Sequence, residues 1–273
     1  MNQPLVSIVT PSLNQGRFIE DAIQSVLAQE YEPIEYVVVD GGSTDETLDV
    51  LGKHANVRWV SEPDGGQSAA LNKGFGLVRG EVLAWLNSDD FYLPGAIADA
   101  VAALQRSNAG LVYADILRCD EDGTNRRRVP SQPWDLWLHL NDRNRIWQPA
   151  AFFTREAFEA VGGVDENLHL AMDYDLWTRI AERFPVERED DVWAAERRHP
   201  GSKTFRHTGD FYREDRRISR AHGGRLISPM LVQHHFGTGR HARLLNRAAA
   251  AIYLAKERRF RTLAARMRAG SPL

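Results

Sequence analysis

The most informative stretch of the chain is VLAWLNSDD, residues 82–90, in which an apolar strand runs directly into two adjacent carboxylates. In an open α/β sheet the ligand crevice lies at the carboxyl ends of the strands, so acids placed there face a ligand. Asp89 and Asp90 repel one another unless a cation or a proton lies between them. Oxygen ligands of this kind suit Mg²⁺ or Mn²⁺ bound together with a diphosphate. The stretch therefore indicates a metal-dependent enzyme that handles a nucleoside diphosphate.

Strands and helices alternate around this stretch. Continuous apolar runs at 5–9, 36–39, 57–60 and 82–86 predict buried strands, and each run ends in polar or glycine residues. Strands of continuous apolar character joined by helices are typical of a parallel sheet covered on both faces. We therefore expect an α/β fold in which several polar loops meet at one edge of the sheet.

Helices are predicted from local signals, among them apolar residues at helical spacing over 19–27 and a proline at position 94 that can begin a helix. Ser43 with Glu46 fits a capping box that begins another. A helix is also expected over residues 67–78, and one over 173–182, where two acids in the first turn suit the helix dipole. Three tryptophans between residues 134 and 147 fit either a core or a platform for stacking a sugar, since both use large flat apolar surfaces.

Composition narrows the class of protein. The chain has 273 residues, of which 43% are hydrophobic and 26% charged, an ordinary profile for a globular protein. Its net charge of −3 argues against a general nucleic-acid partner. Cys119 is the only cysteine, and the N-terminus lacks the basic and apolar regions of a signal peptide. We therefore expect a cytoplasmic protein.

The C-terminal segment has a different character. From Arg240 onward, eight arginines and Lys256 accompany a single acid, Glu257, and apolar residues recur at helical spacing. A basic amphipathic helix can lie on an anionic membrane surface, or it can pack on a domain and leave its basic face in water. Both interpretations remain open, and we expect one domain over residues 1–205 and a helical extension over 206–273.

Five motifs resemble, in order and at plausible spacing, those of the family 2 glycosyltransferases with the GT-A fold. They are TPSLNQGRFIEDAIQSVL, VVVDGGSTDET, EPDGGQSAALNKGF, GEVLAWLNSDD and MDYDLW. The resemblance covers residues 5–205. It implies a Rossmann-like, mostly parallel sheet with helices on both faces, a divalent metal, and inverting transfer of one sugar from a nucleotide-sugar donor to an acceptor hydroxyl. Uridine is the usual base in this family.

The resemblance also implies a nucleotide pocket at the strand ends. Asp40 takes the place of the acid that hydrogen-bonds the base or the ribose, and Asp64 begins the glycine loop that closes the pocket. The residues that match nucleotide-binding positions are Thr10, Pro11, Asp40, Asp64, Asn87 and Ser88.

A metal site follows from the same resemblance. Asn87-Ser88-Asp89 takes the place of the Asp-x-Asp motif, which makes Asp89 the expected ligand of Mn²⁺ or Mg²⁺. Asp90 is expected either behind this ligand or against the donor sugar, and His199 resembles the histidine that completes the metal site. Asn87 replaces an acid and removes one negative charge, which predicts weaker metal binding and not its loss.

Asp173 takes the place of the catalytic base, although Met172 stands where the family has a glutamate. An acceptor hydroxyl is a weak nucleophile and needs such a base within hydrogen-bond reach. The expected acceptor is a saccharide or lipid-linked saccharide at the inner face of the membrane. Two alternatives are a nucleotidyltransferase, which needs a glycine-rich basic loop that residues 11–15 do not provide, and a catalytically silent binding protein with this fold.

Overall fold

The computed structural model describes residues 3–203 and 208–225. The chain folds as two compact units, a larger one of Met1–Trp134 and Asn144–Asp215 and a smaller one of Asp135–Arg143 and Arg216–Leu273. The basic segment from Arg240 onward lies outside the described residues, and the predicted division between residues 205 and 206 stays a prediction.

One mixed sheet organises the larger unit. Within the described residues it has nine strands in the order β3-β2-β1-β4-β8-β6-β9-β5, and β7 pairs with β6. The first four strands of this order are parallel, as predicted, whereas β8 runs antiparallel to both of its neighbours. The strands are β1 (Val6–Ser12), β2 (Ile34–Asp40), β3 (Arg58–Ser61), β4 (Val82–Trp85), β5 (Phe91–Tyr92), β6 (Leu111–Cys119), β7 (Arg127–Val129), β8 (Ala151–Thr154) and β9 (Val186–Arg197).

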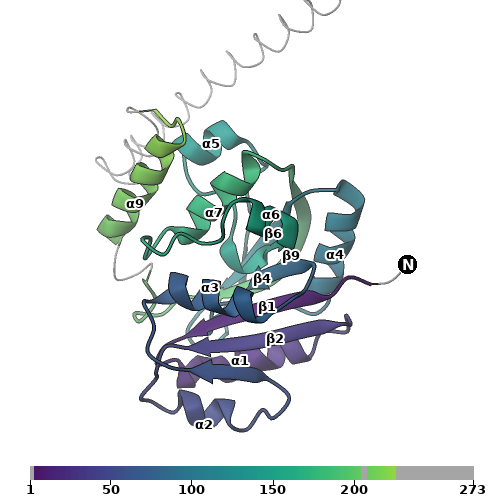
Figure 1. The fold of residues 1–273 in the computed structure, drawn as a ribbon, viewed down its shortest axis with the longest axis vertical. Helices are drawn as coiled ribbons and strands as arrows, with labels where there is room; N and C mark the ends of the chain where they lie inside the picture. Colours follow the sequence, from purple (N-terminus) through teal and green to yellow (C-terminus); the bar gives the residue numbers. More distant parts are fainter. Residues whose placement is uncertain (1–2, 204–207, 226–273) are drawn as a thin grey trace, which may run out of the picture. The chain divides into compact units, whose positions relative to one another are not determined.

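Helices cover both faces of the parallel strands. Figure 1 shows α3 in front of β1 and β2 and α1 behind them. Helix α1 buries Ile19, Ala22, Ile23 and Val26, the apolar positions at helical spacing. The helices are α1 (Gly16–Leu27), α2 (Thr47–Leu51), α3 (Gln67–Leu77), α4 (Ala96–Ser107), α5 (Leu136–Asn141), α6 (Arg155–Ala160), α7 (Met172–Ala181) and α9 (Thr208–Ala221), with a short 3₁₀ turn at Gln148–Ala150.

Helix α3 approaches the sheet closely at Gly74. A Cβ atom at this position would lie 2.4 Å from Val9 Cγ1 and 3.1 Å from Val39 Cγ2. Only a residue without a side chain fits between these two branched neighbours, because cores pack at nearly crystalline density. Gly74 therefore sets the spacing between α3 and the strands β1 and β2, whose ends carry candidate site residues.

The predicted capping box at the start of α2 is wrong. The helix begins at Thr47, whose backbone N–H donates to Asp45 Oδ1 at 3.0 Å. The Ser43 hydroxyl donates instead to Asp40 Oδ1. Ser43 thus belongs to the turn that follows β2, and the local capping pattern is overridden by a buried acid at the strand end.

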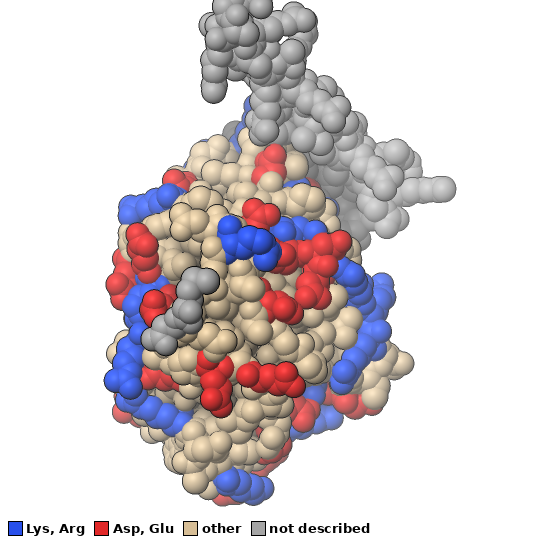
Figure 2. All heavy atoms as spheres, turned by 90° about the vertical axis from the view of Figure 1, so that its right-hand side faces the viewer, with Lys and Arg blue, Asp and Glu red and all other residues tan. Residues whose placement is uncertain are grey.

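On the face that Figure 2 shows, lysines and arginines are interspersed with acids. In the described part of the chain, no helix combines the length and the apolar character needed to cross a bilayer.

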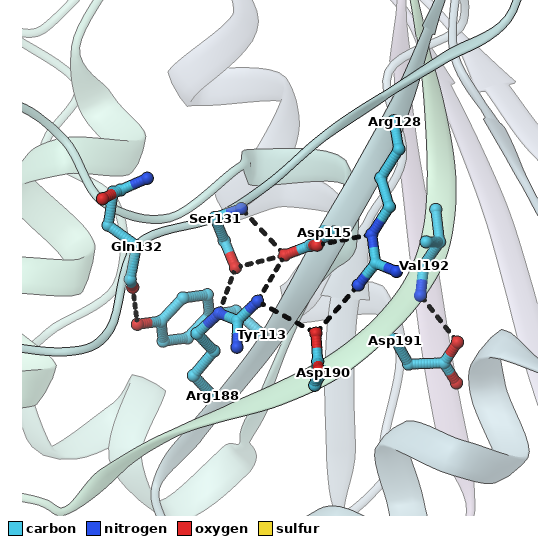
Figure 3. Close-up of polar contacts among 9 residues, drawn as sticks. All are labelled: Tyr113, Asp115, Arg128, Ser131, Gln132, Arg188, Asp190, Asp191 and Val192. Carbon is cyan, nitrogen blue, oxygen red and sulfur yellow. Dashed lines mark hydrogen bonds and ion pairs between the residues drawn. The ribbon is translucent and has the colours of Figure 1, made fainter.

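A buried ion network joins β6 to β9 beside an irregular stretch of their register. Asp115 is 1% exposed and accepts hydrogen bonds from Arg128 Nε at 2.8 Å, from Arg188 Nη2 at 2.9 Å, and from the backbone and hydroxyl of Ser131 (Figure 3). Burial opposes ionisation, but these hydrogen bonds lower the pKa of Asp115. The network fixes the chain just after β7, and the Gln132 carbonyl accepts from Tyr113 Oη at 2.6 Å.

Candidate functional site

The ends of β1, β2 and β3 bring the first predicted residues together. Ser12 pairs with Asp40, and Asp40 pairs with Ser61 in the parallel register. Thr10 and Pro11 are buried, and Thr10 Oγ1 lies 3.0 Å from the Tyr36 hydroxyl. The side chain of Thr10 therefore contributes to the core, and the assignment of Thr10 and Pro11 to a nucleotide pocket stays a prediction.

Asp40 is fully buried and orders the turn that follows β2. Its carboxylate accepts from the backbone N–H groups of Gly42 and Ser43 at 3.1 and 2.8 Å, and from the hydroxyls of Ser43 and Ser61. Three of these hydrogen bonds fall on Oδ2 and one, from the Ser43 hydroxyl, falls on Oδ1. The structure thus gives Asp40 a role in shaping the loop, and its predicted contact to a base or ribose remains untested.

The loop that contains Asp64 closes onto this turn. Asp64 is exposed, and its Oδ1 accepts from the Gly66 N–H at 2.7 Å. A Cβ atom at Gly41 would lie 3.0 Å from Asp64 Oδ2, so glycine at position 41 permits the close approach. Two loops that are separated in sequence therefore meet at the strand ends, as a closing loop over a pocket requires.

Asp89 and His199 come together across 110 residues of sequence. Asp89 Oδ2 lies 3.1 Å from His199 Nε2, and the imidazole is 6% exposed and packs 4.6 Å from the ring of Phe18. Two adjacent ligands of an octahedral ion, each about 2.1 Å from the metal, lie about 3 Å apart. This spacing therefore fits one divalent cation.

The protein offers few ligands for such a cation. Among residues 3–203 and 208–225, no group of three or more His, Cys, Asp or Glu side chains is placed to hold a metal. A cation at Asp89 and His199 would need its remaining ligands from water and a substrate. Mg²⁺ characteristically binds through one or two carboxylates together with waters and substrate phosphates, and Asp89 provides one such carboxylate; an imidazole such as that of His199 is a ligand of transition-metal ions.

Asp90 lies behind Asp89 and not at the surface. It is 4% exposed, and it accepts from the Arg197 backbone N–H at 3.1 Å and from Asn87 Nδ2 at 3.3 Å. Burial, and then the nearby charges of Asp89 and Glu196, raise the pKa of Asp90 well above its ordinary value. Of the two predicted positions for Asp90, its burial favours the one behind the metal ligand.

Arg197 is a site residue that sequence reasoning missed. It is 4% exposed, its Nη1 donates to the Asp89 carbonyl at 3.2 Å, and its guanidinium lies over the rings of Phe18 and Phe91. Arg197 also pairs with Asp21 of α1. The Arg197 backbone N–H donates to Asp90 Oδ1 and its side chain to the Asp89 carbonyl, so Arg197 helps to fix both acids in place.

Asn87 belongs to a chain of amide side chains. Its Oδ1 accepts from Gln67 Nε2 at 2.9 Å, and its Nδ2 donates to Gln148 Oε1 at 2.8 Å. Lys203 Nζ donates both to Gln67 Oε1 at 2.8 Å and to the His169 carbonyl at 3.3 Å. Lys203 thus links the Asn87 side of the site to the segment that precedes α7. Ser88 is buried next to Asn87.

Asp173 lies in the first turn of α7. Asn144 Nδ2 donates to Asp173 Oδ2 at 2.9 Å. Burial raises the pKa of Asp173 to about 6, while hydrogen bonds from the Tyr174 N–H and from Asn144 act in the opposite direction. A carboxylate with this pKa is mostly ionised at neutral pH and is still a useful proton acceptor, because a base works best when its pKa lies near the working pH.

A second acid lies close to Asp173. Asp215 of α9 has its pKa raised to about 8 by burial and then by the charges of Asp173 and Glu214. The two carboxyl groups therefore take up protons at different pH values, as neighbouring acids in a shared low-dielectric environment do. The local sequence around Asp215 does not predict that it lies near Asp173, because the proximity depends on how the chain folds.

Sequence comparison identifies the family of the chain. The family model described as Glycosyl transferase family 2 matches residues 7–160. The chain belongs to this family. An uncharacterized glycosyltransferase of Mycobacterium tuberculosis is 34% identical over 185 residues, which cover 65% of the chain and 69% of that protein. The family resemblance drawn from the five motifs is therefore confirmed.

Longer relatives also match. An uncharacterized glycosyltransferase of Rickettsia felis is 32% identical over 216 residues, and the chondroitin synthase of Escherichia coli is 28% identical over 197 residues. These matches cover 73% and 69% of the chain but only 35% and 28% of the relatives. The chain thus spans about a third of the length of these curated relatives.

Solved structures of GT-A transferases confirm the predicted fold. S. aureus TarS, residues 1–349 in complex with UDP-GlcNAc, superposes with a TM-score of 0.66 at 19% identity, covering 86% of the chain and 74% of TarS. The mannosyltransferase PcManGT from Pyrobaculum calidifontis, in complex with GDP-Man and Mn²⁺, gives a TM-score of 0.57 at 21% identity, covering 96% and 84%. At these identities the likeness concerns the fold alone.

Proposed function

We propose that the protein transfers one sugar, with inversion, from a nucleoside diphosphate sugar to an acceptor hydroxyl. The observation that carries this proposal is the contact between Asp89 and His199 at the polar end of the sheet. A UDP-sugar is the proposed donor. Support comes from family membership and from the ligands of structures with the same fold, which are UDP-GlcNAc in one case and GDP-Man with Mn²⁺ in another.

The leaving group determines what the donor side must do. Breaking the glycosyl phosphate bond leaves a nucleoside diphosphate with concentrated negative charge. Asp89 and His199 would hold Mn²⁺ or Mg²⁺, which when bound acts as a Lewis acid toward that charge. Asn87 and Ser88 are proposed to lie near the ribose, with Asp40, Asp64, Thr10 and Pro11 toward the nucleotide.

Asp173 would act on the acceptor side. Its carboxylate takes the proton of the acceptor hydroxyl as the oxygen attacks the anomeric carbon from the face opposite the departing phosphate. With a pKa of about 6, roughly nine tenths of Asp173 is ionised at pH 7. Proton transfer of this kind contributes about 10²–10⁴-fold to the rate.

The proposed acceptor is a saccharide or lipid-linked saccharide at the cytoplasmic face of a membrane. Helix α9 carries three exposed arginines close together in sequence, Arg216, Arg217 and Arg220. Each basic residue close to an anionic lipid surface adds about 1 kcal/mol of attraction. These side chains support peripheral membrane contact, in the same direction as the basic composition of the segment from Arg240 onward.

A thermal-shift panel tests the proposal. UDP, GDP, dTDP, CDP and ADP are each added with Mn²⁺ and with EDTA. A ligand at 100 times its Kd stabilises the folded state by about 2.7 kcal/mol, which a melting curve resolves. A shift with one diphosphate that requires Mn²⁺ supports a metal-dependent transferase and identifies the base. A folded protein that responds to none of them is instead a silent binding protein with this fold.

A further inference from the structure

The segment that leads into α7 has three backbone N–H groups that α7 itself cannot satisfy. They belong to His169, Leu170 and Ala171, which precede the first helical residue, Met172. The Asp173 carboxylate accepts from the N–H groups of Asp173 and Tyr174 in the first turn. The N–H of Ala171, at the N-cap position, and those of the two residues before it have no acceptor within the helix.

Glu214 of α9 supplies the missing acceptor. Its Oε1 accepts from His169 N at 3.2 Å, and its Oε2 accepts from Leu170 N at 3.0 Å and from Ala171 N at 2.9 Å. Hydrogen bonds to a carboxylate are about twice as strong as neutral ones. The negative charge also lies at the positive end of the α7 dipole, where it is stabilising.

These hydrogen bonds fix the position of Asp173, because Asp173 follows Ala171 by two residues. Its carboxylate is held from another direction by Asn144. Asn144 thus holds the side chain of Asp173, and Glu214 holds the backbone that precedes it. A displacement of 1 Å can lower a rate by about 10²-fold, so the placement of this turn matters to the chemistry.

We infer that Glu214 is a positioning residue for Asp173: its carboxylate holds residues 169–171 so that α7 presents the base to the acceptor hydroxyl. The inference rests on the proposed function for its chemical meaning, but the contact itself does not. It assigns α9 to the acceptor side of the site.

The next residue of α9 supports this assignment. Asp215 is close enough to Asp173 and Glu214 that their charges raise its pKa to about 8. Lys203 also contacts this segment, since its Nζ donates to the His169 carbonyl at 3.3 Å. Glu214 therefore contacts the backbone of residues 169–171, and the next residue of α9 lies within reach of the charge of Asp173.

Hydrogen–deuterium exchange tests the contact without any substrate. Glu214→Gln replaces the carboxylate by an amide of the same shape, and Asp210→Asn serves as a control that removes one acidic charge from a half-exposed position of the same helix, where Asp210 pairs with Arg213. We expect amide exchange at residues 169–171 to become at least about tenfold faster in Glu214→Gln and to stay at the wild-type rate in Asp210→Asn, since opening free energies fall when acceptors are lost. Unchanged exchange at these amides in Glu214→Gln would overturn the inference.

Turnover then tests the positioning role. UDP-GlcNAc and GDP-mannose serve as donors, and release of the nucleoside diphosphate is followed for the wild type, Glu214→Gln, Asp173→Asn and the double variant. We expect Glu214→Gln to lower kcat by about 10²-fold with little change in the donor KM. Added to Asp173→Asn it should cause no further loss, because residues that act through one another are not additive.

The outcomes separate the two proposals. An additive loss in the double variant, or equal losses of kcat and donor affinity in Glu214→Gln, would show that Glu214 acts elsewhere. A wild type that releases no diphosphate from any nucleotide sugar contradicts the proposed function, while the exchange experiment still decides whether Glu214 holds the segment. Melting temperatures of Glu214→Gln and Glu214→Ala identify any general loss of folding.

Discussion

Replacing the proposed base should make the protein more stable. In Asp173→Asn the amide keeps the shape of the side chain, and its oxygen can still accept the hydrogen bond from Asn144. What disappears is a carboxylate whose pKa burial raises from 3.8 to about 6. A group that is harder to ionise in the folded than in the unfolded protein destabilises the folded state at every pH at which it is charged.

The expected gain in stability follows from the pKa shift of Asp173. A rise of about two pKa units, at 1.36 kcal/mol for each unit, corresponds to about 3 kcal/mol at pH 7, where the carboxyl is ionised in both states. This is an upper limit, because part of Asp173 remains exposed to solvent. At pH 5 the folded protein already holds most of the proton, and the difference between variant and wild type falls to about 1.5 kcal/mol.

Urea denaturation of both proteins at pH 7 and pH 5 measures these differences, and nucleoside diphosphate release measures activity in the same samples. We expect Asp173→Asn to be more stable at pH 7, less so at pH 5, and to lose about 10²–10⁴-fold in turnover. The wild type should lose activity as the pH falls through about 6. A variant that is less stable than the wild type at pH 7, or a gap that does not shrink at pH 5, would refute the argument from burial.

Four further variants test other parts of the structure. Asp89→Ala should remove the Mn²⁺-dependent part of a nucleotide thermal shift, and a shift that still requires Mn²⁺ would exclude Asp89 as a ligand. Asp115→Asn should cost about 3 kcal/mol in urea denaturation, the low end for breaking a buried ion pair, because one arginine partner is half exposed. Gly74→Ala should cost about 2 kcal/mol by overpacking against Val9, whereas Gly76→Ala on the same helix meets nothing within 4 Å and should stabilise by about 0.5–1 kcal/mol.

The parallel part of the fold was predictable from the sequence because it depends on local pattern. Continuous apolar runs define β1, β2, β3 and β4, and each predicted end falls within three residues of the observed one. Beyond β4 the pattern is less informative. Strand β8 enters the sheet antiparallel between β4 and β6, a placement that depends on contacts between distant segments and has no local signature.

The residues of the candidate site were likewise predictable only in part. The contact between Asp89 and His199 was expected only from the family resemblance, since no spacing rule relates residues 110 positions apart. Asn144 and Glu214 were missed because each acts on Asp173 or its backbone from a different element. The Ser43 capping pattern failed for the opposite reason, because a good local signal competed with a buried acid that needed the same hydroxyl. Burial makes an unsatisfied carboxylate more costly than an uncapped helix end.

Asn87 shows how the departure from the Asp-x-Asp motif fits its surroundings. An aspartate at this position could accept from Gln67 as Asn87 does, but it could not donate to Gln148 or to the buried Asp90. It would also place a third carboxylate beside two acids, one of which already has a raised pKa because of burial and its charged neighbours. The amide removes that repulsion and satisfies Asp90 with a donor. The acid lost at position 87 is therefore accompanied by a hydrogen-bond donor for Asp90 and by less repulsion between carboxylates, and Asp89 is the acid that contacts His199.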